Sequence, residues 1–318
     1  MNFPVSDHYD GRRFHNKYHR ADRSFREVLR WWRTRESANW PASVPLSNHQ
    51  PPPSTVAPGH AAITFIGHST FVVRTSSAVV VTDPVFTDHA GPYGRFGPRR
   101  VRPPGMLLEQ LPKIDVVLVS HNHYDHLQPS SLLRLQSRFQ PVFVTTLGVG
   151  RYLGRIGLKK VVELDWWESA GVIGDVDVTC TPAQHFSARG LRDRNRTLWG
   201  GFAFRSGGLL SYFAGDSGYC PHFEEIRKRL EPIDIAMIPI GAYEPRWFMK
   251  PIHMNPDDAI RAHLDLNART SIAMHFGTFK LTDESIDEPV RRLSAARVVL
   301  RIPADAFRVP DVGETLLV

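Results

Sequence analysis

Residues 121–126, His-Asn-His-Tyr-Asp-His, constrain what this chain can form more than any other stretch. They follow directly on residues 115–120, an apolar run rich in β-branched side chains, which predicts a buried strand that ends where the histidines begin. A loop at that point can fold back and direct three imidazoles and a carboxylate into one cavity. Neutral imidazole and carboxylate are ligands that suit zinc, manganese and iron. The pattern therefore favours a metal site over a polar surface turn with chance histidines.

Three later side chains of ligand type occupy one kind of position in the predicted structure. His185, Asp216 and His275 each come just after a predicted apolar strand. Strands of one sheet that end together bring such residues to a common rim. With residues 121–126 they supply five imidazoles and two carboxylates, which is enough for two metal ions.

Length and composition are those of a globular protein with a sizeable core. The chain has 318 residues, of which 42% are hydrophobic and 22% charged. No apolar run approaches the roughly 18 residues needed to span a bilayer. The first residues lack the basic-then-apolar order of a secretory signal, so we expect a cytoplasmic protein, with peripheral contact to a membrane left open. Cys180 and Cys220 are the only cysteines, which excludes a disulfide framework.

The positive charge is concentrated near the start of the chain. Net charge is +7, and residues 1–40 hold nine Lys/Arg against five Asp/Glu. This balance permits nucleic acid, anionic lipid or a phosphorylated small substrate without choosing among them. Residues 21–36 predict an amphipathic helix that either lies on a membrane surface or packs its apolar stripe on the core. The spacing favours packing. The stripe consists of Phe25, Val28, Leu29 and Trp32.

The domain organisation follows from proline content and periodicity. Residues 41–60 hold six prolines and no periodicity, so we predict a basic helix and a Pro-rich segment over residues 1–60. A single domain is predicted over residues 61–318, starting with a meander of three antiparallel strands. Strands then alternate with helices, which favours an α/β sandwich. The arginine-rich irregular segment 83–105 is either functional or a structural wrap around the sheet.

With these residues in view, the chain resembles a known family. The seven ligand candidates are similar to the ligand set of the metallo-β-lactamase fold hydrolases. Segments 213–221, 238–249 and 274–279 resemble the branch of N-acylphosphatidylethanolamine-hydrolysing phospholipases D. The resemblance covers roughly residues 60–290. It implies an α/β fold in the form of a four-layer αββα sandwich, and a homodimer.

The resemblance implies two zinc ions, with Mn²⁺ or Fe²⁺ also compatible with the donors. The first ion would take three imidazoles, those of His121, His123 and His185. The second would take Asp125, His126 and His275. Asp216 would bridge the two ions.

Three further residues match family positions beside the metals. His253 matches a histidine near the substrate phosphate, where it would bind the phosphoryl group or protonate the leaving oxygen. Its alternative role is to cap the helix that begins near Pro256. His68 and Asp83 would orient the ligand histidines from outside the metal shell.

The expected activity is hydrolysis of N-acylphosphatidylethanolamine to phosphatidic acid and an N-acylethanolamine, by a metal-bridging hydroxide that attacks phosphorus. The alternative is a metal-dependent lactonase or a hydrolase of a small phosphorylated metabolite. Nucleic acid is not expected as a partner, because basic and aromatic residues do not interleave. A non-enzymatic lipid carrier is disfavoured, because no metal ligand is lost.

Some features depart from the family or leave two interpretations open. Gln128 stands where the family often has an acid, and Phe276 where a tryptophan is common. Residues 247–249, Trp199 and the arginines of residues 95–102 would line an acyl channel. Core packing is the competing interpretation for Trp199 and for Trp247.

Overall fold

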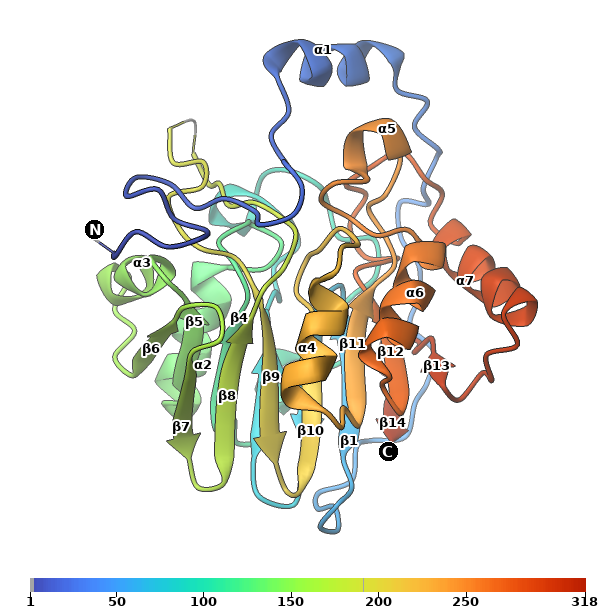
Figure 1. Cartoon of the computed structure of the whole chain (residues 1–318). Coiled ribbons are helices and arrows are strands. Elements are labelled where there is room, and N and C mark those ends of the chain that lie inside the picture. Colours follow the sequence, from blue (N-terminus) through green and yellow to red (C-terminus); the bar gives the residue numbers. More distant parts are fainter. Residues whose placement is uncertain (1–2, 191) are drawn as a thin grey trace.

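The computed structural model describes residues 3–190 and 192–318, and consists of two seven-stranded sheets packed face to face with helices outside them (Figure 1). The first sheet has the order β14-β1-β2-β3-β4-β5-β6 and the second β13-β12-β11-β10-β9-β8-β7. This arrangement confirms the predicted four-layer sandwich. The strands of the first sheet are β1 Ala62–Gly67, β2 Thr70–Arg74, β3 Val79–Thr82, β4 Val116–Val119, β5 Val142–Thr146, β6 Val161–Leu164 and β14 Thr315–Leu317. Those of the second are β7 Ser169–Ile173, β8 Val176–Thr181, β9 Gly201–Ser206, β10 Leu209–Phe213, β11 Ile235–Pro239, β12 Thr270–Met274 and β13 Phe307–Arg308.

Strand β4 explains why its sequence is an unbroken apolar run. Val116 and Leu118 belong to the large core that includes the space between the sheets, whereas Val117 and Val119 pack in a second cluster under the outer helices. Successive strand residues point to opposite faces, so a strand covered on both faces needs apolar residues at every position. The predicted buried strand is confirmed, and its end places residue 120 at the rim of the sheet.

Helices α2 and α3 cover the first sheet, and α4, α6 and α7 cover the second (Figure 1). Helix α6 begins as predicted, because the Asn255 side chain accepts a hydrogen bond from the backbone N–H of Asp258 and caps the helix. His253 therefore does not cap this helix. The helix bounds are α1 Phe25–Thr34, α2 Pro129–Phe139, α3 Val149–Arg155, α4 His222–Leu230, α5 Arg246–Met249, α6 Pro256–Leu266 and α7 Glu288–Val299, with 3-10 turns η1 Pro92–Gly94 and η2 Leu108–Gln110.

Helix α1 is present, but the prediction that its stripe packs on the core is wrong. The helix stands above the body on two extended segments (Figure 1), and Phe25 and Trp32 are exposed. Upstream of it, Tyr9 and Phe14 are buried in the main core. Within the described residues, no helix combines the length and apolarity needed to cross a membrane.

The long segment 83–105 is anchored from inside by a buried arginine. Arg100 donates to the backbone carbonyls of Val85 and Thr87 at 2.6 and 3.0 Å, and its guanidinium lies over the Phe279 ring. Arg100 thus has a structural role rather than a place in an acyl channel. Trp199 is likewise a core residue, because it is buried and its ring N–H donates to the carbonyl of Ala183. Core packing is confirmed for Trp199.

Candidate metal centre

The predicted common rim exists at the carboxyl ends of β8, β10 and β12. Strand β9 is antiparallel to both β8 and β10, and β10, β11 and β12 run parallel, so these ends face the same way. His185, Asp216 and His275 follow those three strands. The loop after β4 comes from the other sheet and meets them, so the cluster lies between the two sheets at one end of the sandwich. This division of the residues between two sheets was not apparent from the sequence.

The loop after β4 is a tight turn that spreads its side chains. The backbone N–H groups of His126 and Leu127 both donate to the carbonyl of His123, at 3.2 and 2.8 Å. This turn separates the first two histidines of the loop from Asp125 and His126. Residues adjacent in sequence consequently serve two separate groups of donor atoms.

Three imidazole nitrogens form the first group. Nδ1 of His123 lies 2.9 Å from Nε2 of His121 and 3.2 Å from Nε2 of His185. Two nitrogens bound at about 2.0–2.1 Å to one tetrahedral zinc would be about 3.3 Å apart, so these separations suit a shared cation. His123 Nδ1 carries at most one proton, so a hydrogen bond can satisfy only one of its two contacts.

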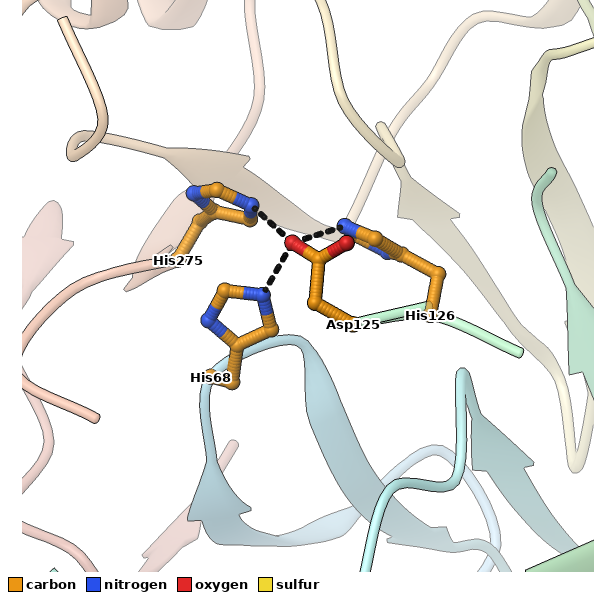
Figure 2. A group of neighbouring side chains, drawn as sticks. All are labelled: His68, Asp125, His126 and His275. Atoms are coloured by element: carbon orange, nitrogen blue, oxygen red, sulfur yellow. Dashed lines mark hydrogen bonds and ion pairs between the residues drawn. The ribbon is translucent and has the colours of Figure 1, made fainter. Parts of the chain in front are cut away.

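The second group surrounds the carboxylate of Asp125 (Figure 2). Its Oδ2 lies 3.0 Å from Nε2 of His68 and 3.5 Å from Nε2 of both His126 and His275. The ligand-type atoms of all four residues lie within 4.8 Å of one another. His68 was expected to orient ligand histidines from outside the metal shell. Its ring contacts the carboxylate, and its backbone carbonyl accepts a hydrogen bond from the N–H of His275.

Asp216 lies between the two groups. Its Oδ2 is 3.1 Å from Nε2 of His126, 3.7 Å from Nε2 of His185 and 4.0 Å from Nε2 of His121. Its Oδ1 is 3.1 Å from Nε2 of His275. One carboxylate thus faces imidazoles of both groups. The structure brings together all seven side chains that the sequence singled out as ligand candidates.

Three of the candidate ligand histidines form a hydrogen bond through Nδ1, on the side of the ring away from the cavity, and this bond determines that Nε2 faces the cavity. Nδ1 of His185 donates to the carbonyl of Ile252 at 2.9 Å. Nδ1 of His126 lies 2.6 Å from Oδ2 of Asp83, and Nδ1 of His121 lies 2.9 Å from Oγ of Ser120. A proton on each Nδ1 leaves Nε2 with a lone pair directed inward, which is the form that binds a metal.

Unpaired buried atoms provide a test of whether a cation fits. Within the part of the chain that the structure describes, Nε2 of His126, Nε2 of His275 and Oδ1 of Asp216 are buried and form no well-aligned hydrogen bond, although the Asp216 carboxylate lies 3.1 Å from both nitrogens. Buried polar atoms normally find a partner, and leaving one unsatisfied costs about 1–3 kcal/mol. Divalent cations would satisfy all three, so the donor set fits divalent metal ions.

The pKa values of the histidines differ within the centre. Burial, with the neighbouring imidazoles, lowers the pKa of His121 well below its usual range. Burial also lowers the pKa of His123 to about 4 and that of His185 to about 3. Burial acts in the same direction on His275, but Asp216 and Asp125 outweigh it and raise the pKa of His275 to about 9. The three-imidazole group is therefore neutral at pH 7, whereas His275 holds a proton beside its carboxylates.

Asp83 supports the centre from outside. The residue is fully buried, and its Oδ1 accepts from the backbone N–H of Ser120 at 2.7 Å. Its Oδ2 accepts from Ser120 Oγ at 2.6 Å and faces Nδ1 of His126. Asp83 thus joins Ser120 to Nδ1 of His126.

Three residues of the centre have left-handed backbones that the sequence did not reveal. His68, Asp83 and His275 have φ values of 58°, 31° and 61°. Non-glycine residues rarely adopt this region, and it occurs where surrounding contacts enforce it, often at functional sites. The hydrogen bond from the N–H of His275 to the carbonyl of His68, at 2.7 Å, joins two of them.

His253 borders both groups, and one of its ring nitrogens lies within 4.8 Å of ligand-type atoms of His185 and Asp216. Its ring centroid lies 5.0 Å from that of His185 and 5.4 Å from that of His275, one histidine from each group. Its Nδ1 is buried and, among the described residues, has no hydrogen-bond partner. Burial lowers the pKa of His253 to about 3, so the ring is neutral at pH 7. The guanidinium of Arg246 donates to the carbonyl of His253 at 2.9 Å and holds the backbone in place.

Arg189 is a residue of the centre that the sequence analysis missed. Its guanidinium donates to the carbonyls of Asn122 and Leu127, at 2.7 and 2.9 Å, and stacks over the Tyr124 ring at 4.1 Å. It thereby clamps both ends of the loop that holds four ligand candidates. An arginine four residues after His185 was the available signal, but nothing local shows which carbonyls it reaches.

Gln128, which stands where the family often has an acid, has a physical reason in this chain to be an amide. The side-chain amide donates to the carbonyls of Tyr124 and Gly91, at 2.6 and 3.2 Å. An ionised carboxylate could make neither bond, because it only accepts. Phe276, at the other departure, stacks on Phe65 with ring centroids 5.7 Å apart.

Comparisons with known proteins agree with this geometry. The family model described as a beta-lactamase superfamily domain matches residues 79–276. A Caenorhabditis elegans protein named N-acyl-phosphatidylethanolamine-hydrolyzing phospholipase D 1 is 40% identical over 265 residues, covering 79% of this chain and 74% of that protein. An uncharacterised protein of Mycobacterium tuberculosis is 39% identical over 292 residues, covering 88% and 76%.

A solved structure of a metallo hydrolase from Ignicoccus hospitalis shares the fold, with a TM-score of 0.61 at 22% identity, covering 81% of this chain and 98% of that one. The matched domain contains all seven ligand candidates and ends just past His275. The chain is thus a hydrolase of the metallo-β-lactamase superfamily and belongs to its family of N-acylphosphatidylethanolamine-hydrolysing phospholipases D.

Proposed function

We propose that this protein is a phospholipase D that uses two zinc ions to hydrolyse N-acylphosphatidylethanolamine to phosphatidic acid and an N-acylethanolamine. The observation on which this rests most is the carboxylate of Asp216, whose two oxygens face imidazoles of both donor groups. The name of the Caenorhabditis elegans relative supports the choice of lipid.

His121, His123 and His185 would hold one ion, and Asp125, His126 and His275 the other, with Asp216 between them. Two divalent ions in such a site lower the pKa of bound water and neutralise charge on a phosphodiester. The rest of the proposed chemistry lies in the residues of this chain.

His253 would contact the phosphoryl group of the substrate. Its ring lies beside one histidine of each donor group, and its Nδ1 has no partner among the described residues. With its pKa lowered to about 3 by burial, it is a neutral ring that donates one hydrogen bond rather than a fixed positive charge. We propose that the ring N–H donates a hydrogen bond to a phosphoryl oxygen and so holds the phosphoryl group in the centre.

The test is release of N-acylethanolamine from mixed micelles by zinc-loaded protein. Asp216→Asn should lower the rate more than about 100-fold, because replacing even an outer partner of a metal site costs 10–100-fold. Asp234→Asn is the matched control: Asp234 accepts from the N–H of Leu210 at the opposite end of β10, far from the centre, and its replacement should leave turnover unchanged.

Isotopic water identifies the bond that breaks. With ¹⁸O-labelled water, attack at phosphorus puts the label in phosphatidic acid and leaves the N-acylethanolamine unlabelled. If the wild type ignores the lipid but cleaves bis(p-nitrophenyl) phosphate, the proposed substrate is wrong and the hydrolase remains. If it cleaves neither and opens lactones, the lactonase alternative replaces the phosphodiesterase.

A second test addresses His253. His253→Ala should lower kcat on the lipid about 10- to 100-fold, because a hydrogen bond to a charged group contributes about 1.5–3 kcal/mol. Zinc content should stay at the wild-type value, because His253 belongs to neither donor group. Loss of zinc together with activity would instead make His253 a metal ligand.

A further inference from the structure

The loop that contains His185 is bound by a side chain from the start of the chain. The side-chain amide of Asn16 forms two hydrogen bonds with the backbone of His185. Its Oδ1 accepts from the N–H at 3.1 Å, and its Nδ2 donates to the carbonyl at 2.8 Å. The two residues are 169 positions apart in the sequence. One side chain therefore binds both backbone polar groups of a proposed metal ligand.

These two bonds complete the fixation of His185. The residue is 1% exposed and lies in an irregular loop after β8, beyond the last residue of that strand that pairs with β9. Buried backbone groups need hydrogen-bond partners, and Asn16 supplies them here. The ring Nδ1 donates to the carbonyl of Ile252, and Nε2 lies 3.2 Å from Nδ1 of His123. Other segments thus hold three polar groups of His185, and the fourth, Nε2, faces the three-imidazole group.

A buried indole determines which way the Asn16 amide is turned. Nε1 of Trp199 lies 3.2 Å from Oδ1 of Asn16. An indole nitrogen can only donate, so the amide atom that it faces must be the oxygen. The amide NH₂ is then directed at the carbonyl of His185, which can only accept. The orientation that pairs with His185 is therefore also the one that satisfies Trp199.

The N-terminal segment is attached to the body independently of Asn16. The backbone N–H of Phe14 donates to the carbonyl of Asn195 at 2.8 Å, and the Phe14 ring is buried in the main core. The side chain of Gln184, next to His185, donates to the carbonyls of His19 and Pro251 at 2.7 and 3.2 Å. Because these contacts keep the segment in place, loss of the Asn16 amide would act on His185 rather than on the segment.

We propose that Asn16 is a positioning residue for the metal ion held by His121, His123 and His185. By fixing the His185 backbone it keeps Nε2 directed at the ion, and a ligand ordered in advance binds more tightly. The inference rests on the proposed function in taking His185 as a ligand. Asn16 lies outside the matched superfamily domain, residues 79–276, so the N-terminal segment contributes to the metal centre of this protein.

The test is transfer of zinc from the full chain to a chromogenic chelator. In Asn16→Ala, one of the two ions should be bound about tenfold more weakly, at the lower end of the 10–100-fold cost of losing an outer partner of a metal ligand. The other ion should be bound as in the wild type. Residue 16 is half-buried and lies outside every helix and strand, so alanine is compatible with folding.

Tyr18→Phe is the matched control. The Tyr18 hydroxyl donates to Glu225 of α4 at 3.0 Å, so this variant removes a side-chain bond of the same segment that does not involve His185. It should bind both ions as the wild type does.

Hydrogen exchange of the metal-free protein tests the contact without any ion. The amide of His185 should exchange at least about tenfold faster in Asn16→Ala, whereas amides of β8 and β10 should exchange as in the wild type, which shows an intact fold. Equal exchange at His185, or unchanged affinity for both ions, would overturn the proposal. An equal loss of affinity for both ions would also overturn it, because that is general destabilisation. Wild-type protein that binds no divalent ion would overturn the proposed metal centre, and this role of Asn16 with it, even where exchange shows that the contact exists.

Discussion

Replacing Asp83 by asparagine should weaken metal binding without touching a proposed ligand. The carboxylate accepts from the backbone N–H of Ser120, from its hydroxyl, and from Nδ1 of His126. An asparagine has one acceptor oxygen and one donor group. If the oxygen keeps the Ser120 N–H, the amide NH₂ faces His126 and favours the ring form that has its proton on Nε2. That nitrogen faces Asp216 at 3.1 Å and is the proposed metal-binding atom.

The expected magnitude follows from that change of protonation. Outer partners of metal-binding histidines contribute about 10–100-fold to affinity, so zinc should bind about 10–100-fold more weakly to Asp83→Asn. The free energy of unfolding of the metal-free protein should change little, because two effects of the substitution oppose each other. A buried donor left without a partner costs about 1–3 kcal/mol. However, burial raises the pKa of Asp83, so the neutral amide removes part of the cost of a buried charge.

Zinc affinity is measured by competition with a chromogenic chelator, and stability by urea unfolding of the metal-free protein. Asp115→Asn is the matched control. Asp115 accepts from the N–H of Val79 at the opposite end of the same two strands, and its replacement should leave zinc affinity unchanged. Zinc affinity of Asp83→Asn within about twofold of wild type would refute the reasoning, because His126 would then not depend on Asp83 for its ring form.

Three other predictions concern the same centre. Arg189→Lys should weaken zinc binding about tenfold by chelator competition, because the lysine side chain is shorter and has no planar guanidinium to stack on Tyr124 and aim one nitrogen at both loop carbonyls. Unchanged affinity would show that the clamp is dispensable. Gln128→Glu should lower the free energy of unfolding in urea by about 1–3 kcal/mol, since a carboxylate would face two carbonyl oxygens; equal stability would contradict this. The low pKa values of His123 and His185, about 4 and 3, keep both rings neutral at about pH 5, where an ordinary histidine is protonated. One zinc ion per chain should therefore survive gel filtration at that pH, and its complete loss would be inconsistent with these shifts.

Local signals in the sequence were enough for most of the strands and for the ligand candidates. Strand β4 could be predicted because a strand covered on both faces must be apolar throughout, and residues 121–126 could be placed because they begin where that strand ends. Parallel strands end on the same side of a sheet, so His185, Asp216 and His275 could be expected at one rim. Strand β7 was missed, because its exposed and half-buried residues have no strong apolar pattern. Helix α7 was not predicted either, and its sequence has a weak helical periodicity.

Other features depend on contacts between distant parts of the chain. The position of Asp216 between two donor groups requires both sheets to meet at one end, and the clamp of Arg189 joins residues more than 60 positions apart. The left-handed backbone of His275 is enforced by its bond to His68, far away in sequence.

Helix α1 shows most directly which features local sequence determines and which depend on the tertiary structure. Its sequence determines that a helix forms and which of its faces is apolar, because periodicity and capping act within a few residues. Periodicity does not determine what covers the apolar face. That depends on where the rest of the chain attaches, and here Trp31, on a neighbouring face, and Arg23, just before the helix, attach the helix to the body. The tertiary structure alone decided that the stripe points outward.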